Sequence, residues 1–312
     1  MKVGFIGLGI MGKSMAANLQ KSGHELVVHD LKRDAAAPHI QAGAVWADTP
    51  RKVAEATEVV LTSLPGPPEM ESVALGEQGL LSGLQKGKVY FDLTTNSPTV
   101  VRKVHAVFAD KGVHLLDAPV SGGPHGARTG KLAIWVGGDE DVFKRCKPVL
   151  DGFSDQAVYV GAIGAGSVTK LVHNMAGYAI QTALAEVFTM GVKAGVEPLA
   201  LWQAVRQGAG GRQRTFDRVP HQFFRGKYDP PNFALRLAHK DVTLATALGR
   251  EFNVPMRVAN LALADLTEAL NRGWGERDSR IPMSLQEERA GVQCRVEESR
   301  LKQGLDEAGL VG

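Results

Sequence analysis

The sequence predicts an α/β protein in two parts, in which a doubly wound parallel sheet precedes an all-helical domain and a long helix joins the two. Three observations support this prediction. Short apolar runs alternate with helical patterns through the first half of the 312 residues, as in successive strand–helix–strand units. A glycine-rich turn follows the first of these runs. A helical period then persists for about 30 residues between Gly161 and Gly195, and further helical patterns follow it.

The composition is that of a globular protein without unusual partners. Hydrophobic residues make up 44% and charged residues 22% of the chain, and its length suffices for two domains. The net charge is only +3 and no dense run of lysine or arginine occurs, so we expect no nucleic-acid partner. No apolar stretch is long enough for a bilayer, which predicts no membrane partner. Cys146 and Cys294 stand far apart, which favours reduced thiols and a cytoplasmic location.

The first apolar run, Lys2–Ile6, is a predicted strand, and a helical pattern begins shortly after it. Six residues lie between them: Gly7, Leu8, Gly9, Ile10, Met11 and Gly12. A G-x-G-x-x-G turn between a strand and a helix is the fingerprint of a Rossmann-type dinucleotide site. Gly7 permits the tight turn, Gly9 lets the backbone approach a pyrophosphate, and Gly12 lets helix and strand pack closely. We therefore expect all six residues to bind the cofactor, with its phosphates at the helix N-terminus.

The second predicted strand, Glu25–His29, ends at Asp30, 18 residues after Gly12. A carboxylate at this point accepts hydrogen bonds from the ribose hydroxyls of the adenosine half of the cofactor. It also repels the additional phosphate of NADP. Lys32 and Arg33 follow at once and offset part of that repulsion. The prediction is therefore NAD, with NADP as the alternative cofactor.

Polar loops follow several later strands. Strands are predicted at residues 59–64, 89–93, 114–118, 132–136 and 158–160. Ligands of such sheets lie outside the carboxyl ends of the strands. We therefore expect Leu64 and Pro65, and the cluster Thr94–Ser97, to lie near the cofactor. The loop Ser121, Gly122 and Gly123 exposes backbone N–H groups that suit a carboxylate, although a flexible loop is the alternative interpretation. Asp117, just before it, is expected to be structural rather than catalytic.

The long predicted helix carries the candidate catalytic group. Lys170 and Asn174 are four residues apart and so lie on one face. Ser167 is the predicted N-cap, which places Lys170 in the first turn. There the helix dipole, together with any burial, lowers the pKa of a lysine toward the range of a general acid/base. A surface lysine is the alternative. The helix itself is predicted from apolar residues at 168, 171, 172, 175, 176, 179, 180, 183, 184 and 187.

Only helical patterns follow, over residues 199–207, 235–252 and 259–272. Lys240 lies near a helix start, and by spacing alone it is a solvated charge. From Gln286 the sequence is charged and loosely periodic. The predicted organisation is a dinucleotide-binding domain over 1–162, an interdomain helix over 163–195, a helical substrate and oligomerisation domain over 196–290, and a peripheral tail over 291–312.

Four longer motifs extend these observations. They are GFIGLGIMGKSMAANL at Gly4–Leu19, DAPVSGGPHGARTGKLAIWVGG at Asp117–Gly138, GAGSVTKLVHN at Gly164–Asn174, and FALRLAHKD ending at Asp241. With them the chain, from residue 1 to about 285, resembles the β-hydroxyacid dehydrogenase family. This family includes 3-hydroxyisobutyrate dehydrogenase and tartronate semialdehyde (2-hydroxy-3-oxopropionate) reductase. The resemblance implies an NAD(P)-dependent oxidoreductase that interconverts a short hydroxyacid and its semialdehyde, and a homodimer or homotetramer formed through the helical domain.

The resemblance also implies roles for individual residues. Lys170 looks like the family's catalytic lysine, which donates the proton in reduction and accepts it in oxidation. Asn174 resembles the partner that helps to hold the substrate, and the loop Ser121, Gly122 and Gly123 matches the one that grips its carboxylate. Thr95 falls where the family contacts the nicotinamide ribose. Lys240 falls where a lysine of the helical domain reaches the cofactor.

The chain departs from the family pattern at three places. His173 stands where an asparagine is usual, three residues after the lysine. This difference bears on the substrate rather than on the reaction type, and a hydrogen bond across the interdomain cleft is an equally open role. Thr94 and Thr95 stand where Ser-Ser or Ser-Thr is usual, and the tail is about twenty residues longer than usual.

Three alternatives remain at this stage. Imine reductases share the glycine fingerprint, but they usually have another residue in place of Lys170. A decarboxylating enzyme of the 6-phosphogluconate type would need a longer helical domain and basic residues for a phosphate, for which Arg206, Arg212 and Arg214 are candidates. A catalytically silent dinucleotide-binding scaffold is the third, and the pairing of Lys170 with Asn174 weighs against it.

Overall fold

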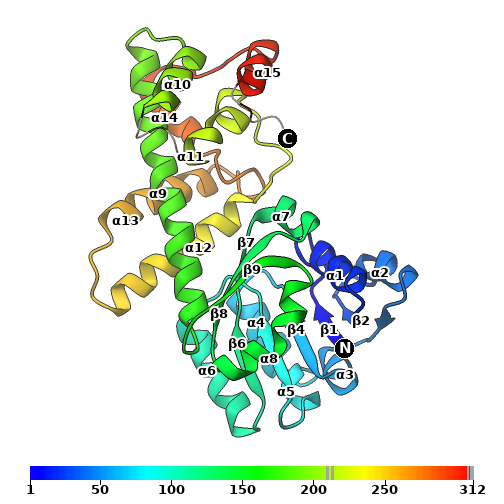
Figure 1. Cartoon of the computed structure of the whole chain (residues 1–312). Coiled ribbons are helices and arrows are strands. Elements are labelled where there is room, and N and C mark those ends of the chain that lie inside the picture. Colours follow the sequence, from blue (N-terminus) through cyan, green and yellow to red (C-terminus); the bar gives the residue numbers. More distant parts are fainter. Residues whose placement is uncertain (209–210, 212–213, 308, 310–312) are drawn as a thin grey trace. The chain divides into compact units, whose positions relative to one another are not determined.

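The computed structural model describes residues 1–208, 211, 214–307 and 309. The chain forms two compact units, Met1–Val172 and His173–Gly312, and the boundary falls inside one long helix, α9 (Ala165–Lys193), drawn in green in Figure 1.

The N-terminal unit is built on one nine-stranded sheet. Six strands run parallel in the order β3-β2-β1-β4-β5-β6, which confirms the predicted Rossmann-type arrangement. Their bounds are β1 (Lys2–Ile6), β2 (Glu25–His29), β3 (Val45–Trp46), β4 (Val59–Thr62), β5 (Val89–Asp92) and β6 (His114–Asp117).

The sheet is not parallel throughout, and here the prediction needs correction. Beyond β6 it continues with β7 (Val120–Ser121), β8 (Leu132–Gly137) and β9 (Ser154–Gly161). Strand β8 runs antiparallel to β6, with Gly137 opposite Asp117, and β9 runs parallel to β8. The chain between β6 and β8 holds only one short helix and β7, which returns it along the sheet in the opposite direction.

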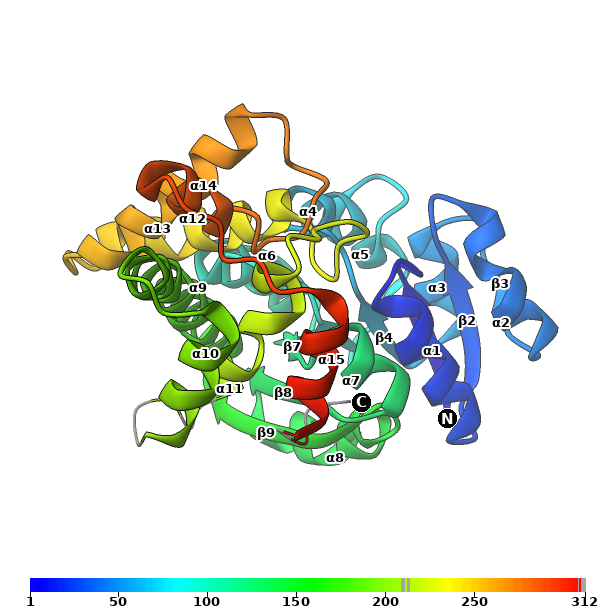
Figure 2. The same cartoon turned by 90° about the horizontal axis from the view of Figure 1, so that it is seen from above.

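Helices cover both faces of the sheet because neighbouring strand residues point to opposite sides. Phe5 enters one buried hydrophobic cluster with Met15 of α1, while Ile6 enters a second cluster with Val53 of α3. Figure 2 shows α8 beside β9 and α2 near β3. The helices of this unit are α1 (Gly12–Lys21), α2 (Ala37–Gln41), α3 (Pro50–Ala56), α4 (Pro67–Leu75), α5 (Leu80–Gly83), α6 (Pro98–Asp110), α7 (Gly123–Thr129) and α8 (Glu140–Asp151), with a short 3₁₀ helix η1 at Arg33–Ala36.

The 29-residue helix α9 was predicted in length but not in its start. It begins at Ala165, so Ser167 is a residue of the first turn rather than the N-cap, and Lys170 lies in the second turn. The effect of the helix dipole on Lys170 is therefore weaker than the sequence suggested, because it fades beyond the first turn. The predicted apolar stripe is also only partly buried, since Val172 is 64% exposed.

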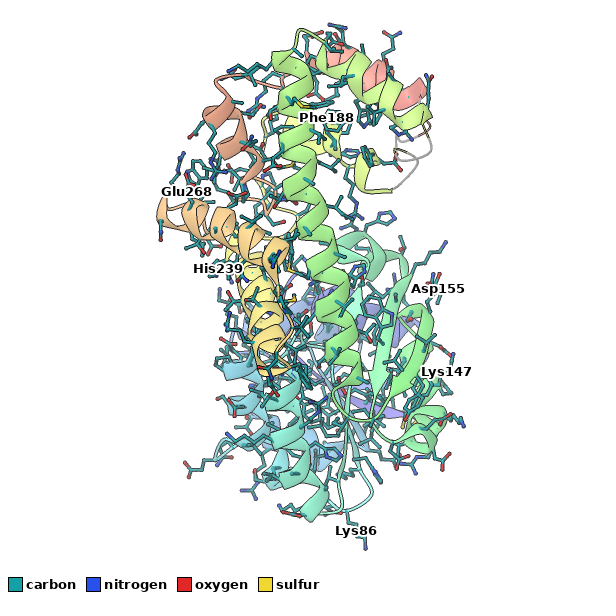
Figure 3. All side chains as sticks on the ribbon, turned by 90° about the vertical axis from the view of Figure 1, so that its left-hand side faces the viewer. Lys86, Lys147, Asp155, Phe188, His239 and Glu268 are labelled. Atoms are coloured by element: carbon teal, nitrogen blue, oxygen red, sulfur yellow. The ribbon has the colours of Figure 1, made fainter. Side chains whose placement is uncertain are left out.

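The C-terminal unit is packed from helices around an aromatic core. Phe188 of α9, labelled in Figure 3, lies with Trp202, Phe223 and Phe224 in this core. None of the helices in the described part of the chain combines the length and hydropathy needed to cross a bilayer. The further helices are α10 (Pro198–Gln207), α11 (Arg214–Asp217), the π-helix η3 (Pro220–Phe224), α12 (Leu235–Glu251), α13 (Arg257–Asn271), α14 (Met283–Ala290) and α15 (Glu298–Glu307).

The segment predicted to be a peripheral tail is part of this core. Cys294, Leu301 and Leu305 are buried in the same cluster as Trp202. Helix α15 places its two leucines four residues apart, so both face inward. The high charge of this segment, which suggested a peripheral tail, belongs to the solvent face of α15.

We expect Leu301→Ala to lower the free energy of unfolding by about 2–5 kcal/mol, because it removes a fully buried side chain and leaves a cavity. The matched control is Lys302→Ala at the exposed neighbouring position, which should stay within about 0.5 kcal/mol of the wild type. Urea denaturation followed by circular dichroism measures both. Equal transition midpoints for the two variants would contradict the packing of α15.

Candidate functional site

In the glycine turn after β1, two glycines lie close to backbone atoms of neighbouring residues, and the third faces empty space. Gly7 has φ of +90°, and a Cβ atom there would lie 2.3 Å from the Ser63 carbonyl oxygen. A Cβ atom on Gly12 would lie 1.8 Å from the Gly7 carbonyl oxygen, so only glycine allows α1 to start so close to the turn. Nothing lies within 4 Å of a Cβ atom on Gly9. The turn thus leaves space above Gly9, where a pyrophosphate can approach the backbone.

The side chains of this turn divide between core and solvent. Leu8 is buried in the sheet's core cluster and Met11 packs against it, whereas Ile10 is 63% exposed. Asp30, at the end of β2, is fixed by the turn itself. Its carboxylate accepts hydrogen bonds from the backbone N–H of Leu8 at 2.7 Å and of Lys32 at 2.8 Å. These residues fit the adenosine and pyrophosphate parts of a dinucleotide.

The loops after β4 and β5 are tied together at the same edge of the sheet. The Leu64 backbone N–H donates to the Thr94 hydroxyl at 3.2 Å, beside the exposed Pro65. Thr95, half-buried, follows at once. The two loops that are predicted to contact a cofactor therefore lie side by side.

Asp92 at the end of β5 shapes the second loop, a role that was not predicted from the sequence. It is fully buried and accepts hydrogen bonds from the Thr62 hydroxyl, the Thr94 backbone N–H and the Asn96 side-chain amide at 3.0, 3.1 and 2.9 Å. Burial raises its pKa, and these donors oppose the rise. An aspartate that ends an apolar strand just before a polar cluster was the available signal.

The predicted carboxylate-binding loop lies between β7 and α7. Ser121 ends β7 and is half-buried, while Gly122 and Gly123 are exposed and have φ of +134° and +61°. Both angles favour glycine. Gly123 is the first residue of α7, so the backbone N–H groups of this loop belong to a helix start, where an anion is favoured.

Helix α9 starts at the same edge, against the end of β6. The Asp117 carboxylate accepts hydrogen bonds from the backbone N–H of Gly164 at 2.7 Å and of Ser167 at 2.6 Å. Lys170 follows one turn later and is only 9% exposed. The alternative of an amine in bulk solvent does not agree with this burial. All the residues of this unit predicted to bind ligand thus follow strand ends of one sheet or the helix start attached to it.

In the helical unit, Asn174 and Lys240 meet at one carboxylate. The Asn174 side-chain amide donates to Asp241 Oδ2 at 2.6 Å, and the Lys240 ammonium lies 2.8 Å from Asp241 Oδ1. Asp241 is 1% exposed. Lys240 is therefore ion-paired rather than a solvated charge. His173, the departure from the family pattern, is exposed on α9.

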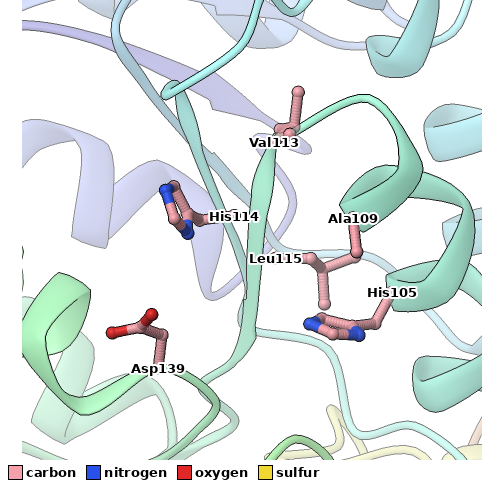
Figure 4. A pocket seen from close by; sticks show the side chains of 7 residues that line it. His105, Ala109, Val113, His114, Leu115 and Asp139 are labelled. Atoms are coloured by element: carbon pink, nitrogen blue, oxygen red, sulfur yellow. The ribbon is translucent and has the colours of Figure 1, made fainter.

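A cavity also lies away from the residues that are predicted to bind ligand. A cavity of about 190 Å³ lies near the start of β6, with His105, His114 and Asp139 around an apolar floor (Figure 4). It lies toward the amino end of β6, which begins at His114, whereas the glycine turn follows the carboxyl end of the parallel strand β1. Within the described part of the chain, no group of three or more His, Cys, Asp or Glu side chains is arranged to hold a metal ion.

Arg206 is engaged within the helical unit. It is ion-paired with Asp217 at 2.7 Å and its guanidinium stacks over Trp202. Arg212 and the side chain of Arg214 lie outside the described residues. Arg206 thus has partners that leave it poorly placed to bind a substrate phosphate.

Comparison with known proteins decides the family. Residues 2–161 match the family of the NAD-binding domain of 6-phosphogluconate dehydrogenase. Residues 164–284 match the family described as NAD-binding of NADP-dependent 3-hydroxyisobutyrate dehydrogenase. The chain belongs to the β-hydroxyacid dehydrogenase family. As a member of this family, it is an NAD(P)-dependent oxidoreductase that acts on a hydroxyacid, as predicted.

Individual relatives agree with this assignment. The chain is 36% identical to the 2-(hydroxymethyl)glutarate dehydrogenase of Eubacterium barkeri over 94% of its own length and 97% of that protein. It is 38% identical to a 3-hydroxyisobutyrate dehydrogenase of Pseudomonas aeruginosa, over 78% and 84% of the two chains. The solved structure of 3-hydroxyisobutyrate dehydrogenase from Mycobacterium tuberculosis with L-serine superimposes with a TM-score of 0.82 at 27% identity, covering 91% and 98% of the two chains.

Imine reductases share the fold of this β-hydroxyacid dehydrogenase. The enzyme from Myxococcus stipitatus superimposes with a TM-score of 0.58 at 21% identity, over 91% of this chain and 98% of that one. This likeness shows the fold alone.

We expect Gly9→Ala to fold like the wild type and yet to bind NADH at least about tenfold more weakly, because its methyl group enters the open space above the turn. Gly12→Ala should instead lower the thermal unfolding midpoint, since its methyl group meets the Gly7 carbonyl oxygen. Fluorescence titration with NADH and thermal unfolding separate the two effects. Unchanged NADH binding by Gly9→Ala would refute the placement of the cofactor over this turn.

Proposed function

We propose that the protein interconverts a short-chain β-hydroxyacid and its semialdehyde, of the 3-hydroxyisobutyrate or 2-hydroxy-3-oxopropionate type, with Lys170 as general acid and base. One observation carries the proposal. The buried Lys170 lies one turn beyond a helix start that Asp117 attaches to the carboxyl edge of the sheet. The glycine turn and the loops after β4 and β5 lie at that same edge.

The chemistry divides between cofactor and side chains. Bound NAD(P) supplies the hydride acceptor in oxidation and the hydride donor in reduction. Lys170 takes the hydroxyl proton in oxidation and returns it to the carbonyl oxygen in reduction. We assign Asn174 and the loop Ser121, Gly122 and Gly123 to orientation of the substrate carboxylate, and Thr95 to the nicotinamide ribose. The hydrogen bond from Asn174 to Asp241 supports this assignment, because it fixes the amide before substrate arrives.

The names of the relatives support a substrate class. 3-Hydroxyisobutyrate, L-serine and 2-(hydroxymethyl)glutarate each carry a hydroxymethyl group on the carbon that bears the carboxylate. They differ in the other substituent on that carbon. We therefore propose a substrate with this common unit, in which the helical unit, including His173, selects the variable substituent.

We further propose a preference for NAD, with Asp30 as the discriminating residue and Lys240 as a cofactor contact from the helical unit. The two amide donors that hold the Asp30 carboxylate support this preference, because they keep its charge directed at the adenosine ribose. A homodimer or homotetramer and a cytoplasmic location complete the proposal. Exposed apolar side chains on the helical unit, Met190 of α9 and Leu261 of α13 among them, support an oligomer.

We expect Lys170→Met to lose about 10²–10⁴-fold in kcat, because the proton then has no acceptor or donor at the reacting oxygen. NADH binding should stay within about threefold of the wild type. The control is Lys193→Met, which changes an exposed lysine of the same helix. Oxidation of 3-hydroxyisobutyrate, L-serine and 2-(hydroxymethyl)glutarate, followed at the NADH absorbance, measures kcat. Wild-type turnover by Lys170→Met would remove the proposed mechanism, and a wild type inactive on all three acids would remove the proposed substrate class.

We expect Asp30→Asn to raise the ratio of kcat/KM for NADP to that for NAD by at least about tenfold, since it removes a negative charge beside the extra phosphate of NADP. Asp34→Asn, at an exposed position nearby, is the matched control and should leave the ratio unchanged. Steady-state kinetics with both cofactors at a fixed hydroxyacid concentration give the two ratios. Equal ratios for Asp30→Asn and the wild type would rule out Asp30 as the discriminating residue.

A further inference from the structure

We infer that Asp117 is a positioning residue for the reaction: its carboxylate fixes the start of α9 and thereby the location of the Lys170 side chain. The inference rests on the proposed role of Lys170 as general acid and base. It assigns to Asp117 a function in turnover, beyond holding the fold together, although Asp117 itself does not touch the substrate.

The contact joins two distant parts of the chain. Asp117 ends β6, and the two N–H groups that it binds lie 47 and 50 residues later. Backbone N–H groups at the start of a helix have no partner within the helix, and a carboxylate is the strongest acceptor that a side chain offers them. One carboxylate thus satisfies two such groups three residues apart. The strand therefore determines where α9 begins and how its first turns are oriented.

Two glycines allow this contact. A Cβ atom on Gly137 would lie 2.5 Å from Asp117 Oδ1, and one on Gly166 would lie 2.7 Å from the Asp117 carbonyl oxygen. The Asp117 side chain is fully buried. The close approach of Gly137 and Gly166 and the burial of the carboxylate oppose shifts of Asp117, and precise placement of a group one turn away requires such a fixed support.

A second buried carboxylate provides an internal comparison. Asp92 lies opposite Asp117 on the neighbouring strand β5 and is equally buried. Its hydrogen bonds go to the loop after β5, with Thr94 and Asn96, rather than to α9. Asp92 is thus expected to govern the loop beside the cofactor, whereas Asp117 governs the helix of the catalytic lysine.

The pH dependence of turnover provides a second test of the role of Asp117. Burial raises its pKa to about 6, although the N–H groups of Gly164 and Ser167 oppose the rise. A protonated carboxyl carries a hydrogen on one oxygen, and this oxygen accepts more weakly from the amide that faces it. The ionisable groups on the adjoining elements include Tyr90 and Asp92 on β5, Arg102 on α6, Tyr159 on β9 and Lys170 on α9.

The effect of Asp117 protonation on kcat is best measured in the direction of reduction. In reduction Lys170 must carry its proton, so its own ionisation limits the rate only on the alkaline side. A fall in kcat below about pH 6 then reports the protonation of Asp117 rather than that of Lys170.

The experiment compares Asp117→Asn, Asp117→Ala and Asp92→Asn with the wild type. We expect Asp117→Asn to lose about tenfold and Asp117→Ala about a hundredfold in kcat for semialdehyde reduction, with NADH affinity within about threefold of the wild type. Asp117→Asn should also lack the fall in kcat below about pH 6. Asp92→Asn should change NADH affinity and retain that fall. Wild-type kcat together with an unchanged acid limb in Asp117→Asn would overturn the inference.

A readout without turnover separates this inference from the proposed function. The rate at which an amine-reactive acylating reagent modifies Lys170 in the folded enzyme is measured without turnover, by mass spectrometry of the peptide that carries it. Measurement at several pH values separates the effect of side-chain placement from that of the pKa of the amine. We expect this rate to change at least about threefold in Asp117→Asn and to stay unchanged in Asp92→Asn. If the wild type reduces no semialdehyde but the labelling changes as expected, the proposed function fails and the positioning role stands. Asp117→Asn preserves the shape of the side chain, so it remains informative if Asp117→Ala does not fold. Unchanged labelling of Lys170 in Asp117→Asn contradicts the positioning role.

Discussion

The interaction on which the N-terminal unit depends is the one between a buried carboxylate and two backbone N–H groups. Asp117 ends β6, the last of the six strands that run parallel to one another, and Gly164 and Ser167 lie at the start of α9. The antiparallel strand β8 passes beside this contact with a glycine opposite Asp117. Without the carboxylate, a helix start would be buried with unsatisfied donors, which costs more than an ordinary hydrogen bond contributes. The sheet and helix α9 are therefore joined by hydrogen bonds at this point as well as by apolar packing.

This contact has a cost that depends on pH. The pKa of Asp117 in the folded protein, about 6, lies above the usual value of 3.8, so between these values the folded state binds more protons than the unfolded state. The free energy of unfolding contributed by this group consequently falls as the pH rises from about 4 to about 6. Asp92, whose pKa is also raised by burial, contributes with the same sign. The ionised form that holds both amides is thus the less stable one, a combination expected where placement serves function rather than stability.

Local patterns predicted much of this structure, and distant contacts account for what they missed. The strands β1 and β2, the glycine turn and the length of α9 follow from periodicity and turn chemistry, which act within a few residues. The start of α9 did not follow, because the group that caps it comes from β6, far back in the sequence. The direction of β8 depends on pairing with β6, and the burial of α15 depends on the aromatic core formed around Trp202. The partnership of Asn174 and Lys240 through Asp241 likewise joins helices that are distant in sequence.

The same kind of contact, an aspartate carboxylate that accepts hydrogen bonds, recurs among the residues proposed to form the site. Asp30 binds the glycine turn at Leu8, Asp92 binds the loop at Thr94, Asp117 binds the start of α9, and Asp241 binds Asn174. In each case an aspartate outside the reacting centre accepts hydrogen bonds from the segment that carries the functional group. A carboxylate binds several N–H donors at once and has few rotatable bonds, so it orders a loop or helix start at small entropic cost. The proposed hydride transfer requires that donor, acceptor and proton carrier be held in place before reaction. Three of these carboxylates order segments of the N-terminal unit from the ends of β2, β5 and β6, and the fourth, on α12, orders Asn174 within the helical unit.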